Sequence, residues 1–246
     1  GPAVRREVPG QAGDIMFHSR DRFRELFRKK WVLLGGVFAL GVVSGALALS
    51  LVRPRPPEME STGGRPLPGK VEQVLNELES ISLIRRLMML NVAREDGALL
   101  KMLVEMTGAT RALEIGTSNG YSSLWIGAGL QSTGGKLTTL EIDADKVKMA
   151  RVNFEKAGLR DTITVIEGDA LKTLPGLKGP FDFVFIDAWK EDYFQYFRTV
   201  FPRVTRGGLI IGHNAVEHAS LMKDYLDAVT RHPDLETVII STAGED

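Results

Sequence analysis

The chain has 246 residues, 43% of them hydrophobic and 25% charged, a size that allows one full α/β core but hardly a second. Its formal net charge is zero and residues 60–246 carry no long run of one sign, so bulk electrostatics favour a small-molecule partner and no nucleic acid. The absence of cysteine excludes disulfides, a thiolate nucleophile and a cysteine-based zinc site.

The first 69 residues divide into three segments of different composition. Residues 1–30 are basic, and because they open with Gly1-Pro2 like an expression tag, residues 1–15 are left out of the expected fold. Residues 31–52 carry no charge over 22 positions, which is long enough for a transmembrane helix. Residues 53–69 are rich in proline and glycine and predict an extended linker.

The uncharged segment 31–52 predicts a single-pass membrane protein. A cleaved signal peptide, with Ala46-Leu47-Ala48 as its cleavage site, and a buried helix are the alternatives. Arginine and lysine are more frequent before the segment than after it, which favours a cytoplasmic N-terminus and places the following domain outside. Gly41 and Gly45 have the spacing of helices that dimerise in membranes.

Residues 70–246 predict one globular domain. Two helical patterns, near 71–81 and 99–108, come first, and short apolar runs then alternate with amphipathic stretches. The expected strands are 111–115, 136–142, 162–168, 181–188, 208–214 and 235–241, and the helices between them are 120–131, 144–157, 191–201 and 217–231. This alternation is typical of a doubly wound, Rossmann-like, mainly parallel sheet with helices on both faces, whose ligands bind beyond the carboxyl ends of the strands.

The first strand of this series ends in a glycine-rich turn, Glu114-Ile115-Gly116-Thr117-Ser118-Asn119-Gly120-Tyr121-Ser122. Glycines at 116 and 120 let a ligand approach the backbone, and the start of the next helix offers free N–H groups. The turn lacks the G-x-G-x-x-G spacing of dinucleotide sites, and a glycine here also occurs for packing alone.

Acidic residues end the next two strands. Glu141 follows the turn by about 25 residues, where a carboxylate can accept hydrogen bonds from ribose hydroxyls. Gly168-Asp169 adds an acceptor where an adenine amino group would lie. Together with the turn, these residues indicate a nucleoside-bearing ligand without a tightly bound pyrophosphate.

The fourth strand leads to Asp187, Trp189 and Lys190, and the fifth leads to His213 and Asn214. Because these strands are neighbours in a parallel sheet, Asp187, His213 and Asn214 are expected to converge on a divalent cation, with Lys190 beside it. Taken singly, each residue also fits a helix cap, a surface charge or a polar loop position.

The motifs LEIGTSNGYS, TLEID, GDA, FDFVFIDAWKEDY and GGLIIGHN resemble the cation-dependent O-methyltransferases of the catechol and caffeoyl-CoA type, over about residues 70 to 241 and in the family's order. The resemblance implies S-adenosylmethionine as methyl donor and a catechol-like hydroxyl as acceptor. The donor site would be lined by Val92, Glu114, Gly116, Ser118, Gly120, Tyr121, Ser122, Glu141, Ile142, Gly168, Asp169, Ala170, Asp187 and Trp189. Asp187 and Asn214 would bind the metal and Lys190 would act as general base.

Two positions depart from the family. His213 stands where an aspartate is usual, which leaves open whether the metal is magnesium, manganese or zinc. A metal-independent enzyme that uses His213 as its base is the second possibility. The family's sheet ends with a seventh, antiparallel strand, whereas this sequence stops at Asp246 after the sixth expected strand. Two explanations remain for the missing strand: the sequence is truncated, or another chain completes that edge of the sheet.

The alternative from another functional class is a protein that keeps the methyltransferase fold and binds the cofactor but does not catalyse methyl transfer. A nucleic-acid methyltransferase is disfavoured because the chain has no basic stripe and no Asn-Pro-Pro-Tyr motif, and a nicotinamide oxidoreductase because it has no pyrophosphate fingerprint. The resemblance also implies a cytosolic methyl donor and hence a cytoplasmic catalytic domain, against the charge bias around 31–52. Family members are often dimers, so a homodimer is expected on resemblance alone.

Overall fold

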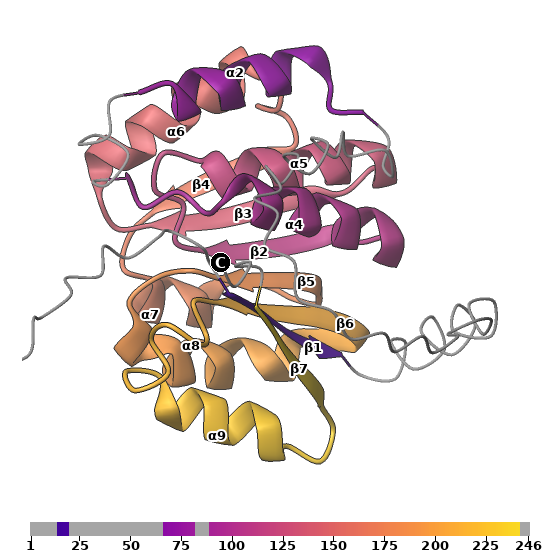
Figure 1. Ribbon diagram of the computed structural model, residues 1–246, viewed down its shortest axis with the longest axis vertical. Coiled ribbons are helices and arrows are strands. Elements are labelled where there is room, and N and C mark those ends of the chain that lie inside the picture. Colours follow the sequence, from indigo (N-terminus) through magenta and orange to yellow (C-terminus); the bar gives the residue numbers. More distant parts are fainter. Residues whose placement is uncertain (1–13, 20–65, 82–88, 242–246) are drawn as a thin grey trace, which may run out of the picture.

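The computed structural model describes residues 14–19, 66–81 and 89–241. Within these ranges seven strands form one sheet in the order β4-β3-β2-β5-β6-β1-β7 (Figure 1). The strands are β1 (Asp14–Ser19), β2 (Arg111–Ile115), β3 (Lys136–Glu141), β4 (Ile163–Glu167), β5 (Phe181–Ile186), β6 (Val204–His213) and β7 (Glu236–Ser241). Strands β2 to β6 pair in parallel, which confirms the predicted doubly wound core.

Helices cover both faces of the sheet. One face carries α2 (Gly69–Glu79), α4 (Arg94–Thr107), α5 (Tyr121–Thr133) and α6 (Ala144–Lys156), and the other carries α7 (Ala170–Thr173), α8 (Tyr193–Val200) and α9 (Lys223–Arg231), as Figure 1 shows. Short 3-10 turns, η2 (Leu174–Gly176), η3 (Lys190–Asp192) and η4 (Phe201–Arg203), join elements of the second face. The last helix begins at Lys223, later than expected, because residues 215–222 form turns.

The central strand β5 belongs to both cores of the protein. Phe183 and Phe185 point into the core under α4 and α5, whereas Val184 and Ile186 point into the core under α8 and α9. Side chains alternate along a strand, so the apolar sequence FDFVFI is buried on both faces and fixes β5 in the middle of the sheet. The residue after Ile186 therefore emerges at the centre of the sheet's carboxyl edge.

Strand β1 lies where the sequence leaves a seventh strand unassigned. It runs antiparallel to both neighbours, with Met16 opposite Gly212 of β6 and opposite Ile239 of β7. This strand comes from the N-terminal part of the same chain, including residues 14 and 15, which the sequence analysis leaves out of the fold. Another chain is therefore not needed to complete this part of the sheet.

The predicted membrane localisation is wrong on this structure. Across the ranges that the structure describes, no helix combines the length and the apolar character that a membrane crossing needs. The uncharged segment 31–52, with Gly41 and Gly45, lies outside the described residues. The single-pass anchor and its predicted orientation are not retained.

Candidate active site

The glycine-rich turn after β2 lies directly against the backbone at the end of β5. Gly116 has φ +102°, and a Cβ atom placed on it would lie 2.0 Å from the carbonyl oxygen of Asp187. The Asp187 N–H also donates to the Ile115 carbonyl oxygen at 2.8 Å. Only glycine fits this position without displacing Asp187.

Glu141, at the end of β3, holds the other side of the turn. Its Oε2 accepts a hydrogen bond from the Ser118 N–H at 2.7 Å, and its Oε1 accepts one from the Asp143 N–H at 2.9 Å. Its carbonyl oxygen accepts from the Gly168 N–H at 2.8 Å. The structure thus brings Ser118, Glu141 and Gly168 together, and Ile142 beside them is exposed.

Residues 89–92 lie next to this turn. The Ser118 hydroxyl donates to the Met89 carbonyl oxygen at 2.6 Å, although these residues are far apart in sequence. Val92 is buried, Leu90 is exposed, and the buried Oδ1 of Asn91 has no hydrogen-bond partner in the described residues. This segment, which contains the predicted donor-site residue Val92, therefore borders the turn and carries one acceptor that is unsatisfied among the described residues.

Glu114 is fully buried beneath the turn. Its carboxyl accepts hydrogen bonds from Ser122 at 2.6 Å, from Thr139 at 2.6 Å and from Ser123. Its pKa is raised to about 7, because burial and, to a smaller extent, the nearby Asp187 outweigh the three hydroxyls that lower it. Glu114 thus ties the first turn of α5 to β2 and β3, and sequence reasoning missed Ser123 and Thr139.

Three other predicted residues make structural contacts of their own. Tyr121 is buried, and its hydroxyl donates to Glu79 of α2 at 2.6 Å, away from the turn. Asp169 caps α7 by accepting from the Leu171 N–H at 2.9 Å, and Ala170 is the first residue of that helix. The structure does not bring the Tyr121 hydroxyl to the edge where Glu141 and Asp187 lie.

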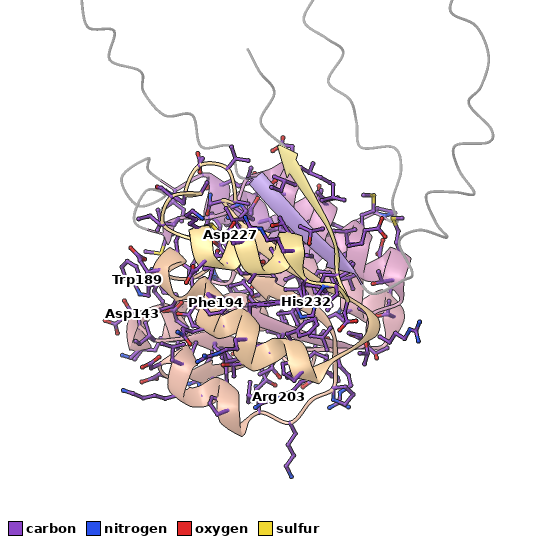
Figure 2. The ribbon with its side chains drawn as sticks, turned by 90° about the horizontal axis from the view of Figure 1, so that it is seen from below. Asp143, Trp189, Phe194, Arg203, Asp227 and His232 are labelled. Atoms are coloured by element: carbon purple, nitrogen blue, oxygen red, sulfur yellow. The ribbon has the colours of Figure 1, made fainter. Side chains whose placement is uncertain are left out.

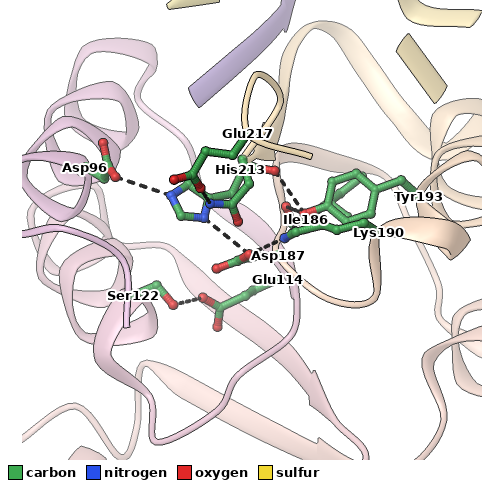
Figure 3. A network of polar contacts seen from close by, with 10 residues as sticks. Asp96, Glu114, Ser122, Ile186, Asp187, Lys190, Tyr193, His213 and Glu217 are labelled. Carbon is green, nitrogen blue, oxygen red and sulfur yellow. Dashed lines mark hydrogen bonds and ion pairs between the residues drawn. The ribbon is translucent and has the colours of Figure 1, made fainter. Parts of the chain in front are cut away.

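An anchored lysine stands at the carboxyl end of β5 (Figure 3). The Lys190 ammonium donates to Asp187 Oδ1 at 2.9 Å and to the Tyr193 hydroxyl at 2.9 Å. The Tyr193 hydroxyl in turn donates to the Ile186 carbonyl oxygen at 2.9 Å. These contacts fix the position of the ammonium relative to the strand.

His213 lies between two carboxylates, as Figure 3 shows. Its Nε2 is 3.3 Å from Asp96 Oδ2, and its Nδ1 is 3.3 Å from Asp187 Oδ1, while its side chain is only 6% exposed. Burial lowers the pKa of the imidazole, but Asp187 and Asp96 outweigh burial and raise that pKa to about 9. Burial likewise acts to raise the pKa of Asp187, yet Lys190 and His213 hold it well below its usual value.

Asp96, on α4, is a site residue that sequence reasoning missed. It is fully buried, and its Oδ1 has no hydrogen-bond partner in the described part of the chain. A signal was present, because Asp96 falls on the apolar stripe of α4 with Leu100 and Leu103, where an unpaired acid is costly.

The three predicted cation ligands, Asp187, His213 and Asn214, all lie close to other side chains. The two carboxylates lie on opposite sides of the His213 ring, and the Asp187 Oδ1 atom is already shared with Lys190. The Asn214 amide donates to Glu217 Oε2 at 3.0 Å. Within the described ranges, no three acidic or histidine side chains could hold a metal ion together.

Apolar side chains lie exposed around this edge. Trp189, next to Asp187, is 70% exposed, and Leu90, Ile142 and Val216 are also exposed. Figure 2 shows Trp189 and Asp143 on the same side of the molecule, away from His232. Apolar surface flanking a few fixed polar groups is the usual composition of a small-molecule site.

The chain is similar in sequence to known O-methyltransferases. The family model described as O-methyltransferase matches residues 68–237. A catechol O-methyltransferase from Mycobacterium tuberculosis is 34% identical over 206 residues, covering 78% of this chain and 92% of that protein. A caffeoyl-CoA O-methyltransferase from Eucalyptus globulus is 31% identical over 153 residues, covering 60% of this chain and 62% of that protein.

Two solved structures share the fold. Cofactor-bound Rv0187 from MTB superposes with a TM-score of 0.63 at 30% identity, covering 78% of this chain and 93% of that one. The O-methyltransferase from Bacillus cereus in complex with SAH gives 0.60 at 29% identity, covering 72% and 92%. The fold is the Rossmann-like fold of methyltransferases, and the chain belongs to the O-methyltransferase family.

Proposed function

We propose that this protein transfers a methyl group from S-adenosylmethionine to a hydroxyl of a small, catechol-like molecule. The observation that carries the proposal is the meeting of the glycine turn, Glu141 and the anchored Lys190 at one edge of the sheet. The catechol O-methyltransferase and the SAH-bound relative described above support it.

The residues of this edge suit a nucleoside-bearing methyl donor. Each carboxylate oxygen of Glu141 accepts one backbone N–H, which leaves a second lone pair on each oxygen for ribose hydroxyls. Gly116 lets the turn lie against Asp187, and Asn91 has a buried acceptor without a partner among the residues that the structure describes. We propose that the donor lies between this turn and residues 89–92.

The donor supplies a methyl group bound to a positively charged sulfur. As the acceptor oxygen bonds to that methyl group and the bond from methyl to sulfur breaks, the hydroxyl proton must leave the acceptor. Lys190 stabilises the developing oxyanion because its ammonium is held by Asp187 and Tyr193 and needs no reorganisation. Most of the acceleration comes from this charge and from alignment of the two reactants.

His213 does not suit the role of general base. Both ring nitrogens face carboxylates and the pKa is raised to about 9, so the ring is protonated at neutral pH and has no lone pair to accept a proton. This leaves Lys190 as the residue whose ammonium stabilises the oxyanion, while the hydroxyl proton passes to solvent water.

Methyl transfer from labelled S-adenosylmethionine to a panel of catechols and monophenols tests the proposal. Lys190→Gln is expected to lower kcat by about 10²-fold without changing SAH affinity, because the charge acts on the reacting oxygen. Lys178→Gln, an exposed lysine outside the site, is the matched control. Binding of SAH with no methylation of any acceptor would instead favour a cofactor-binding protein without turnover.

A further inference from the structure

The last residue of α2 carries a carboxylate that two other helices share. Glu79 Oε1 accepts a hydrogen bond from the Tyr121 hydroxyl at 2.6 Å and another from Arg94 Nη1 at 2.8 Å. Tyr121 is the first residue of α5 and Arg94 is the first residue of α4. Because both donors meet at one oxygen atom, Glu79 fixes the separation between the starts of these two helices.

The same two helix starts border the proposed donor site. Tyr121 directly follows the glycine-rich turn, and Arg94 comes two residues after the segment 89–92. The turn and the segment also touch directly, where the Ser118 hydroxyl donates to the Met89 carbonyl oxygen at 2.6 Å. The two walls of the site are therefore joined twice, once by this hydrogen bond and once through Glu79.

Arg94 makes its other polar contacts to the same helix as Glu79. Its Nη1 donates to Asn76 Oδ1 at 3.2 Å, and its Nη2 lies 3.9 Å from Glu72 Oε1. Positions 72, 76 and 79 share one face of α2, because they are spaced by four and three residues. The side chains of Arg94 and Glu79 are only 39% and 33% exposed, and Tyr121 is 3% exposed, so water weakens these contacts less than it weakens a surface pair.

Glu77, on the same helix, provides a contrast. Its carboxylate accepts hydrogen bonds from Gln73 of α2 and from Lys156 of α6, the latter at 3.3 Å, and this ion pair is about half exposed on both sides. The pair joins α2 to α6 and includes neither the glycine-rich turn nor the segment 89–92. Glu77 thus helps to hold α2 in place without fixing the walls of the donor site.

We propose that Glu79 is a positioning residue for the methyl donor, which holds the glycine-rich turn and the segment 89–92 at the separation that the donor needs. This inference rests on the proposed function. Glu79 acts through Tyr121 and Arg94, and its effect belongs to donor affinity and not to the chemical step. Because coupling between two binding events is reciprocal, the bound donor in turn stabilises the packing of α2.

The first test is the affinity of the full chain for SAH, measured by isothermal titration calorimetry. Glu79→Ala and Tyr121→Phe are each expected to raise the Kd by about 10-fold. The double variant is expected to be no weaker than Glu79→Ala, because the two changes remove one shared contact. Glu79→Gln keeps an acceptor oxygen and is expected to lose less affinity. The matched control is Glu77→Ala, which is expected to keep the wild-type Kd.

The second test separates binding from chemistry in the methyl-transfer assay. Glu79→Ala is expected to raise the KM for S-adenosylmethionine by about 10-fold, whereas kcat at saturating donor is expected to change much less. A purely structural role predicts that Glu77→Ala and Glu79→Ala, once matched for melting temperature, have the same KM. That result overturns the inference.

The third test does not depend on turnover. SAH is expected to slow amide hydrogen exchange in α2 of the wild type and of Glu77→Ala, and to slow it much less in Glu79→Ala. Equal protection in all three chains, or an SAH affinity of Glu79→Ala equal to that of the wild type, overturns the inference even if the wild type methylates catechols. If the wild type binds SAH but methylates no acceptor, the proposed function fails, while the SAH affinities and the exchange rates still decide the role of Glu79.

Discussion

Replacing Gly116 with alanine tests the contact that joins the two halves of the site. The turn after β2 packs so closely on Asp187 that the new Cβ would lie 2.0 Å from its carbonyl oxygen, and at φ +102° an L-residue is also strained. Either the turn or the end of β5 has to move. We expect Gly116→Ala to lose both stability and activity.

The magnitude follows from two separate costs. A residue with a side chain at this positive φ costs about 1–2 kcal/mol, and relieving an overpacked contact costs about 1–3 kcal/mol more. Gly134, at φ +73°, has no atom within 4 Å of its added Cβ, so Gly134→Ala isolates the first cost. The free energy of unfolding is therefore expected to fall by about 2–5 kcal/mol in Gly116→Ala and by about 1–2 kcal/mol in Gly134→Ala.

Urea unfolding of the two variants measures the difference, and the melting temperature of Gly116→Ala is expected to fall by roughly 5–15 °C. A shift of Asp187 and Lys190 of about 1 Å is also expected to lower kcat by about 10²-fold. If Gly116→Ala is no less stable than Gly134→Ala and keeps its kcat, the close approach of the turn to Asp187 is refuted.

Three further predictions concern buried groups and β1. The pKa of His213 is raised from 6.5 to about 9, so the stabilisation from its protonated ring is complete below pH 6.5 and is lost as pH rises through about 9. Across that window the free energy of unfolding of the wild type is expected to fall by about 3 kcal/mol relative to His213→Gln, as measured by denaturation at each pH. The pKa of Glu114 is raised from 4.5 to about 7, so the stability that its protonated carboxyl contributes is lost as pH rises from 4.5 through 7. Glu114→Gln is expected to remove this fall in the free energy of unfolding with pH, and an unchanged fall would contradict the burial argument. Met16→Pro removes a backbone donor from β1, between β6 and β7, and is expected to lower hydrogen-exchange protection at Gly212 and Ile239, whereas unchanged protection would show that β1 does not pair there.

The parallel core was predictable because its signals are local. The expected strand 111–115 coincides with β2, and the apolar run of β5 was recognisable because a strand buried on both faces has no polar alternation. The positions of Glu141, Asp187, Lys190 and His213 were predictable by the same logic, since each ends or follows a strand at the carboxyl edge of the sheet.

The features that sequence reasoning missed depend on distant contacts. Asp96 pairs with a histidine far along the chain, and its own helix gives no sign of that partner beyond an acid on an apolar stripe. The contact of His213 with Asp187 was predictable because the two residues end or follow neighbouring strands, whereas its contact with Asp96 was not. Pairing of residues 14–19 with β6 and β7 is similarly beyond any local pattern.

The position of β1 also has a consequence for synthesis on the ribosome. This strand leaves the ribosome before the other described strands, but its neighbours β6 and β7 are the last of them to follow. Its hydrogen-bonding groups therefore have no strand partners until β6 has been synthesised, while the parallel strands β2 to β5 and their helices can already assemble. This side of the sheet forms only after the rest of the parallel core has been made.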